Sequence, residues 1–386
     1  MKKNVLILLT SSFFCLVYVS FSIVPPLMGD AFEYHSAAMS ILNFSVYSSQ
    51  SHSAFQFSRP PFFPLVLAAI GGNRIADWIL QSIMVGVMSV VIYYIVPTKK
   101  NIAPIVVTLW CVPYVALGMH SDILSGLMMS LSILIASRND KSKSIGLYTC
   151  ASFLSHRAAM LYAVVPFLKT RSKLLFLVVF AVPVIVWSSY VYYYSGVFWV
   201  STLDSSITLS YGTMTGIKVG GDQGRHSQAQ VEESLRIMKL MEGKTDKERI
   251  SYTRTLVKEQ WSNTSLLDAM LYVPTSYTYQ LFSSNDEFFK YIGLNIDRKY
   301  TRLIYGSIGL LMAIGIGISI VKRIEPVMVL GYFMVAGICI LNGSYTSSRN
   351  LIVAMPSVAL FFCVGYDFLE SKIIKLVNMG RFLWMG

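Results

Sequence analysis

The feature that most constrains this chain is a series of apolar runs, each about as long as a lipid bilayer is thick. An α-helix needs roughly 17 to 25 predominantly apolar residues to cross the hydrocarbon core. Such runs recur along the sequence, in which 54% of the 386 residues are hydrophobic and only 13% are charged. A soluble domain carries about twice that share of charge. The sequence therefore predicts an all-α polytopic membrane protein.

About ten transmembrane helices are expected from these runs. They are residues 4–24, 75–97, 102–119, 122–137, 145–156, 157–168, 174–196, 303–321, 327–343 and 351–368. The two short runs within 145–168 cannot each cross a bilayer, because a helix rises only about 1.5 Å per residue. We therefore expect them to form one broken or re-entrant element that bends at Ser155, His156 and Arg157, a shape allowed where it lines protein or a watery cavity.

The formal net charge of +12 raises the question of nucleic-acid binding. Outside the segment 197–302, most Lys and Arg residues fall at one set of helix ends, and the opposite short connections carry chiefly Arg59 and Arg349. Basic residues favour the cytoplasmic side of a membrane. We therefore expect both termini in the cytoplasm, residues 25–74 on the outer face, membrane lipids as partners, and no nucleic acid.

Three regions follow from this pattern. Residues 1–196 form an N-terminal transmembrane module that includes the outer loop 25–74, and residues 303–386 form the last helices and a cytoplasmic tail. Between them, residues 197–302 hold thirteen Lys and Arg against twelve Asp and Glu. After a Ser-, Thr- and Gly-rich start, this segment shows helical spacing of apolar residues. We expect a mostly helical extracytoplasmic insertion that caps the bundle.

Two carboxylates open the first outer loop. Asp30 and Glu33 are three residues apart, so they share a helix face with Tyr34 beside them. One interpretation is helix capping, in which an N-cap Asp and a Glu at the third position bond to free backbone N–H groups. The other is catalysis, since partial burial raises the pKa of a carboxylate toward the value that a general base needs. Spacing alone leaves both open.

A second acid lies at the outer end of two tightly joined runs. Asp122 follows His120 in the sequence His-Ser-Asp and could simply cap the helix that begins at Ile123. Alternatively, Asp122 and Asp30 converge on one cavity, where with His120 they could hold a divalent cation or orient an acceptor. A lone histidine is more often structural than a ligand. The metal question stays open.

Three arginines are expected at the outer or middle depth of the membrane: Arg59, Arg157 and Arg349. Any one of them could extend its side chain to lipid headgroups without a further role. Three together, against the positive-inside bias, favour a site. A guanidinium matches a phosphate bidentately and keeps its charge. Pro60 and Pro61 follow the first arginine and would hold it rigidly at the cavity mouth.

Taken in order, these motifs resemble the GT-C superfamily of integral-membrane glycosyltransferases, above all the branch with protein mannosyltransferases and the aminoarabinose transferase of lipid A. The matching motifs are Gly29-Asp30-x-x-Glu33-Tyr34, Ser58-Arg59-Pro60-Pro61, His120-Ser121-Asp122, Ser155-His156-Arg157 and Ser348-Arg349-Asn350-Leu351. The likeness covers roughly residues 1–200 and 300–370. It departs where protein mannosyltransferases have adjacent Asp and Glu, and where the last helix begins Arg-Asn instead of Arg-Tyr.

The resemblance implies a GT-C-like fold, an isoprenoid-phosphate sugar donor and inversion at the anomeric carbon. Its acidic loop residue corresponds to Asp30, the candidate base. The candidate catalytic residues are Asp30, Glu33 and Asp122, and the candidate substrate-binding residues are Tyr34, Arg59, His120, Arg157 and Arg349. No particular cofactor is implied, and a divalent cation at Asp30 and Asp122 stays open.

The expected function is an inverting transferase that moves a sugar from a polyprenyl-phosphate donor to a polysaccharide or glycolipid acceptor. By association with the family, we expect it in a bacterial inner membrane, with its active site on the periplasmic face. An O-antigen polymerase or ligase is the first alternative, although a charge-balanced large loop disfavours it. A transporter or flippase is the second. Transporters place polar residues at mid-bilayer, whereas here the acids lie at the outer rim, apart from Asp77.

Overall fold

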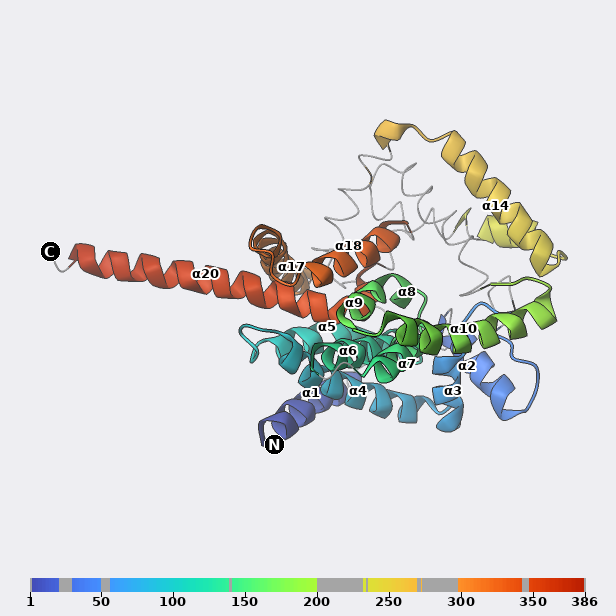
Figure 1. Cartoon of the computed structure of the whole chain (residues 1–386), viewed down its shortest axis with the longest axis horizontal. Helices are drawn as coiled ribbons and strands as arrows, with labels where there is room; N and C mark the ends of the chain where they lie inside the picture. Colours follow the sequence, from blue (N-terminus) through green and yellow to red (C-terminus); the bar gives the residue numbers. More distant parts are fainter. Residues whose placement is uncertain are drawn as a thin grey trace.

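The computed structural model describes residues 2–20, 30–49, 56–138, 141–199, 232–233, 235–268, 272, 298–341 and 347–384. Every regular element among these residues is a helix, so the expected all-α class is confirmed. Figure 1 shows a packed group of helices from which the C-terminal part of α20 (Met355–Trp384) projects alone.

Five stretches of the described chain are long and apolar enough to cross a membrane. They are α1 (Lys2–Ser20), α4 (Arg74–Ile95), α10 (Lys173–Ser195), residues Leu303–Val321 of α17 (Arg298–Val321), and Leu351–Lys375, which joins the 3-10 turn η3 (Leu351–Ala354) to α20. The chain is therefore a membrane protein by length and composition of its helices, but ten full spans are not confirmed.

The remaining expected spans correspond to helices of 4 to 17 described residues, shorter than the five candidate spans. They are α5 (Ala103–Leu117), α6 (Asp122–Arg138), α7 (Ser142–Phe153), α8 (Ala159–Tyr162), α9 (Val164–Lys169) and α18 (Pro326–Leu341). The 17 residues of α6 rise only about 25 Å. Hydropathy located these helices correctly, and which of them cross a membrane stays a prediction, because an apolar helix can also pack inside the bundle.

The predicted break at residues 155–157 is confirmed. Helix α7 ends at Phe153 and α8 begins at Ala159. The start of α7 and the end of α9 lie side by side, because the hydroxyl groups of Ser142 and Thr170 are 2.9 Å apart. Residues 142–169 therefore form a helical hairpin whose tip holds His156.

One end of the bundle gathers basic residues. Lys3 donates to Asn101 at 2.6 Å, and Lys169 pairs with Glu325 at 2.6 Å. Lys99 pairs there with Glu370. The helices run antiparallel from this end. The starts of α4 and α6, the tip of the hairpin and the starts of α19 (Ser347–Asn350) and η3 therefore lie at the other end, beside α2 (Asp30–Leu42) and α3 (Phe62–Ala69).

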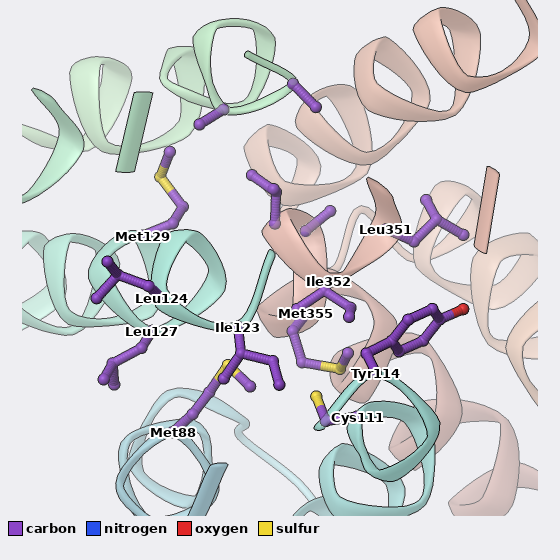
Figure 2. Packing of buried hydrophobic residues seen from close by; sticks show 14 of the residues in the cluster. Met88, Cys111, Tyr114, Ile123, Leu124, Leu127, Met129, Leu351, Ile352 and Met355 are labelled. Carbon is purple, nitrogen blue, oxygen red and sulfur yellow. The ribbon is translucent and has the colours of Figure 1, made fainter. Parts of the chain in front are cut away.

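The core packs directly beneath that second end. Figure 2 shows Met88 of α4, Cys111 of α5, Ile123 of α6, and Ile352 and Met355 of the C-terminal segment meeting in one cluster. Cys111, Ile123, Ile352 and Met355 have no exposed surface. The residues that begin α6 and η3 are thus held on a rigid apolar base. Cys15, Cys111, Cys150 and Cys363 are buried and free.

The crossing of α17 and α20 depends on two glycines. A Cβ on Gly315 of α17 would lie 1.8 Å from the carbonyl oxygen of Phe361, and one on Gly365 of α20 would lie 2.0 Å from that of Leu311. No side chain fits between these backbones. Small residues at such crossings let membrane helices approach closely.

We expect Gly315→Ala to destabilise the protein by at least about 1–3 kcal/mol, the usual cost of overpacking. The matched control is Gly317→Ala, because nothing lies within 4 Å of a Cβ at that position of the same helix. Thermal unfolding of both variants in detergent provides the measurement. Equal melting temperatures for the two would contradict this packing.

The insertion is described only in part. Helix α14 (Asp246–Ser262) begins with a capping box in which Thr245 and Glu248 bond to each other's backbone N–H groups. Ile237, Met241 and Ile250 are buried, and Arg254 lies over the Trp199 ring, 5.4 Å from its centroid. The helical expectation is confirmed for this part. The Ser-, Thr- and Gly-rich start of this segment, residues 201–224, lies outside the described residues.

Candidate functional site

Arg59 joins two acids of α2. Its Nη2 donates to Oδ1 of Asp30, and its Nε donates to Oε2 of Glu33 at 2.5 Å. Ser58 also donates to Oε2 of Glu33, at 3.2 Å. The carboxylates of Asp30 and Glu33 therefore both face residues 58–59. Their three-residue spacing places them on one face of α2, where both pair with Arg59.

Local structure holds Arg59 in place. Its backbone oxygen accepts a hydrogen bond from the Tyr47 hydroxyl at 2.9 Å, and its guanidinium carbon lies 5.5 Å from the centre of the Tyr34 ring. The two prolines that follow lead into α3, and the N–H of Phe62 donates to the oxygen of Leu154 at 2.9 Å. The loop is thus tied to the hairpin that carries His156.

Arg349 joins the other two acids. Its Nη2 donates to Oδ2 of Asp30 at 2.6 Å, and its Nε lies 3.3 Å from Oδ2 of Asp122. Asp30 and Arg349 are 319 residues apart in the chain. A glycine permits this approach, since a Cβ on Gly126 would lie 2.6 Å from the oxygen of Ile352. One turn earlier on α6, Asp122 meets the start of the C-terminal segment.

Histidines and hydroxyl groups complete the cluster. Nδ1 of His120 lies 3.4 Å from Nη1 of Arg349, and the hydroxyl groups of Tyr34 and Ser121 are 2.6 Å apart. At the tip of the hairpin, Nε2 of His156 lies 3.3 Å from Oδ1 of Asp122. Five separate segments of the chain therefore meet in one polar site at the end opposite the basic residues.

The electrostatics of the site differ from expectation at Asp30. Burial by itself raises the pKa of this carboxyl, but Arg59 and Arg349 lower it more, to well below its usual value. The expectation that burial brings Asp30 to a pKa near neutrality is wrong for the chain by itself. Burial raises the pKa of the Tyr34 hydroxyl to about 12, so that group stays neutral.

His120 is neutral at pH 7, because burial and then Arg349 lower its pKa to about 4. A pKa lowered by folding gives stability that is present above the unfolded value, 6.5, and is lost as the pH falls toward the folded value. We therefore expect the folded chain to lose stability between about pH 6.5 and 4. A His120→Gln variant should lose part of this dependence, as measured by melting temperature against pH. Identical profiles would contradict a buried neutral His120.

The divalent cation gains no support. Within the described ranges, no group of three or more His, Cys, Asp and Glu residues could hold a metal ion. The two acids considered as ligands, Asp30 and Asp122, are instead joined by the Arg349 guanidinium.

Seven of the eight candidate residues thus lie in one network of ion pairs, hydrogen bonds and ring contacts: Asp30, Glu33, Tyr34, Arg59, His120, Asp122 and Arg349. Arg157 follows His156 at the hairpin tip, near enough for its charge to act on that imidazole. The structure adds three residues that were not selected as candidates: Ser58, Ser121 and His156. All three lie inside or beside the motifs, and adjacency to a selected residue was the only signal in the sequence.

Neither protein-family models nor curated proteins match this chain. The function must therefore be inferred from the site.

Proposed function

We propose that this chain is an inverting glycosyltransferase that takes a sugar from a polyprenyl-phosphate donor. The observation that carries the proposal is the cluster of two arginines and three acids at one end of an apolar bundle. Charge at such a place is costly and marks function more often than structure. Paired guanidinium groups suit a lipid phosphate, and the adjacent acids suit an acceptor hydroxyl.

Donor binding would rearrange the ion pairs. In the chain without a donor, Arg59 and Arg349 each donate a hydrogen bond to Asp30. A donor phosphate offers the same guanidinium groups two charged oxygens in a matching geometry and would compete with Asp30 for them. As an arginine turns to the phosphate, Asp30 loses the charge that lowers its pKa while its burial remains. The donor itself would thus convert Asp30 from a weak base into an effective one.

The chemical step would then be a single displacement. The acceptor oxygen attacks the anomeric carbon, its proton passes to Asp30, and the bond from that carbon to the phosphate oxygen breaks. The lipid phosphate leaves with the bonding electrons, and Arg59 and Arg349 stabilise its negative charge. Attack opposite the leaving group inverts the anomeric carbon. Asp122, which pairs with Arg349 and lies beside His156, would keep the arginine aligned.

The alternatives predict other geometry or other products. A transporter would place its polar site midway along the spanning helices, whereas this cluster lies at helix ends. A polymerase or ligase would act on lipid-linked glycans with the same arginine chemistry, so it differs in the product and not in the donor group. A bacterial inner membrane and a periplasmic site belong to the proposal.

Binding of the purified chain in nanodiscs tests the proposed donor group. We expect a polyprenyl-phosphate sugar to bind at least about tenfold more tightly than the same sugar on polyprenol without phosphate, the loss of charge-assisted bonds being worth at least 1.4 kcal/mol. Equal affinity for the two lipids would contradict the proposal, because the arginines would then make no use of the phosphate.

A further inference from the structure

A buried carboxylate outside the cluster contacts the cluster's central turn. Asp77 lies in the first turn of α4 and has no exposed surface. Its Oδ2 accepts hydrogen bonds from Nε2 of Gln81 at 2.8 Å and from the backbone N–H of Met119 at 2.6 Å. A carboxylate is the strongest acceptor that a side chain can offer to a backbone N–H. The bond therefore ties α4 to the connection between α5 and α6.

The connection between α5 and α6 has a strained backbone. Gly118 and Met119 both have positive φ, 66° and 50°, and the second of these is a conformation that residues with a Cβ rarely adopt. A Cβ on Gly118 would lie 2.7 Å from Nε1 of Trp78, the neighbour of Asp77. Helix α4 thus contacts two consecutive residues of the turn. Strained backbone persists only where its surroundings fix it.

The turn carries three residues of the site. Directly after Met119 come His120, Ser121 and Asp122, which contact Arg349, Tyr34 and His156 respectively. A small rotation at Met119 would move all three, and misplacement of a catalytic group by about 1 Å costs on the order of a hundredfold in rate.

We propose that Asp77 is a positioning residue, which holds the turn at residues 118–122 so that His120, Ser121 and Asp122 face Arg349 and Tyr34. Asp77 touches no member of the cluster itself and acts through the N–H of Met119. The use of this turn in sugar transfer rests on the proposed function. The placement of the turn does not.

The titration of His120 tests this positioning without any substrate. The chain is labelled with 13C-histidine, reconstituted in nanodiscs, and titrated by NMR, with a His120→Gln variant to assign the signal. We expect His120 to titrate near pH 4 in the wild type. In Asp77→Ala the turn loosens, so His120 gains water and moves away from Arg349. Its pKa should then rise by about 1 unit or more. Asp77→Asn keeps an acceptor for Met119 and should leave the titration within about 0.3 unit.

The control is Ser89→Ala, which removes a buried hydroxyl elsewhere on α4 and should change nothing. An unchanged His120 titration in folded Asp77→Ala would overturn the proposal, as would an equal shift in Asp77→Asn or in Ser89→Ala. If Asp77→Ala does not fold, Gln81→Leu removes the amide that orients the Asp77 carboxylate toward Met119. The carboxylate can then turn away from that N–H, and the pKa of His120 should rise by a smaller amount. An unchanged pKa in Gln81→Leu would equally overturn the role. Absence of transferase activity would refute the proposed function and leave this result to decide the role of Asp77.

Discussion

Replacing Arg349 by alanine should produce the largest loss of any single substitution in this chain. The side chain forms ion pairs with Asp30 and Asp122 at once and is only 16% exposed. Its removal leaves two acids with less compensation, and breaking a buried ion pair costs about 3–5 kcal/mol. Loss of one preorganised hydrogen-bond donor that stabilises charge in the transition state also lowers kcat by about 10²–10³-fold. Unfolding and transfer, measured on the same preparation, should both show the defect.

Two variants separate charge from geometry. Arg349→Lys keeps the charge but lacks the fork that reaches both acids, so we expect it to recover most of the stability and little of the activity. Arg236→Ala removes an exposed arginine that pairs with Glu233 on the surface and should change neither. Full activity in Arg349→Lys would contradict a bidentate role. Near wild-type stability and activity in Arg349→Ala would contradict the cluster as a functional unit.

Replacing Asp30 by asparagine should move binding and catalysis in opposite directions. The substitution keeps the size of the side chain and removes the charge that engages both arginines. The donor phosphate then has one competitor fewer for those guanidinium groups, with Glu33 and Asp122 still present, so donor affinity should be equal to wild type or higher. The base is lost, and transfer should fall by about 10²–10⁴. Donor binding and single-turnover transfer, measured separately, resolve the two effects.

A structural role for Asp30 predicts a different pattern. If Asp30 only braced the arginines, donor binding and transfer would fall together, because Arg59 and Arg349 would lose their positions. Asp268→Asn is the matched control, since Asp268 is an exposed acid that accepts from Ser265 at 2.5 Å. It should behave as the wild type in both assays.

Helix positions were predictable from the sequence, whereas the number of helices that cross a membrane was not. The expected run 174–196 is observed as α10, Lys173–Ser195, because apolar residues end where the bilayer or the bundle ends. The run 122–137 is likewise a helix, α6, but it begins with a buried acid and has no exposed surface at several serines. Hydropathy measures apolar character and cannot tell a spanning helix from one packed within the bundle.

The candidate site was predictable as a set of residues, because charge in apolar surroundings is conspicuous. Its wiring was not. Nothing in the spacing of Asp30 and Arg349 indicates that they meet, and the contact depends on Gly126, whose missing side chain lets Ile352 approach α6. The low pKa of Asp30 follows from the same contact. Burial alone would have raised it, and only the three-dimensional position of two arginines reverses the sign.

Transfer of radiolabelled sugar from a polyprenyl-phosphate donor to acceptors in native membranes is the most direct test of the proposed activity. We predict that the wild-type chain adds single sugars to the acceptor and leaves unlabelled lipid phosphate, and that Asp30→Asn and Arg349→Ala, at normal membrane levels, do not. If the wild type moves no label while longer lipid-linked glycans disappear from the same membranes, the chain is a polymerase or ligase, and the proposed transferase is contradicted.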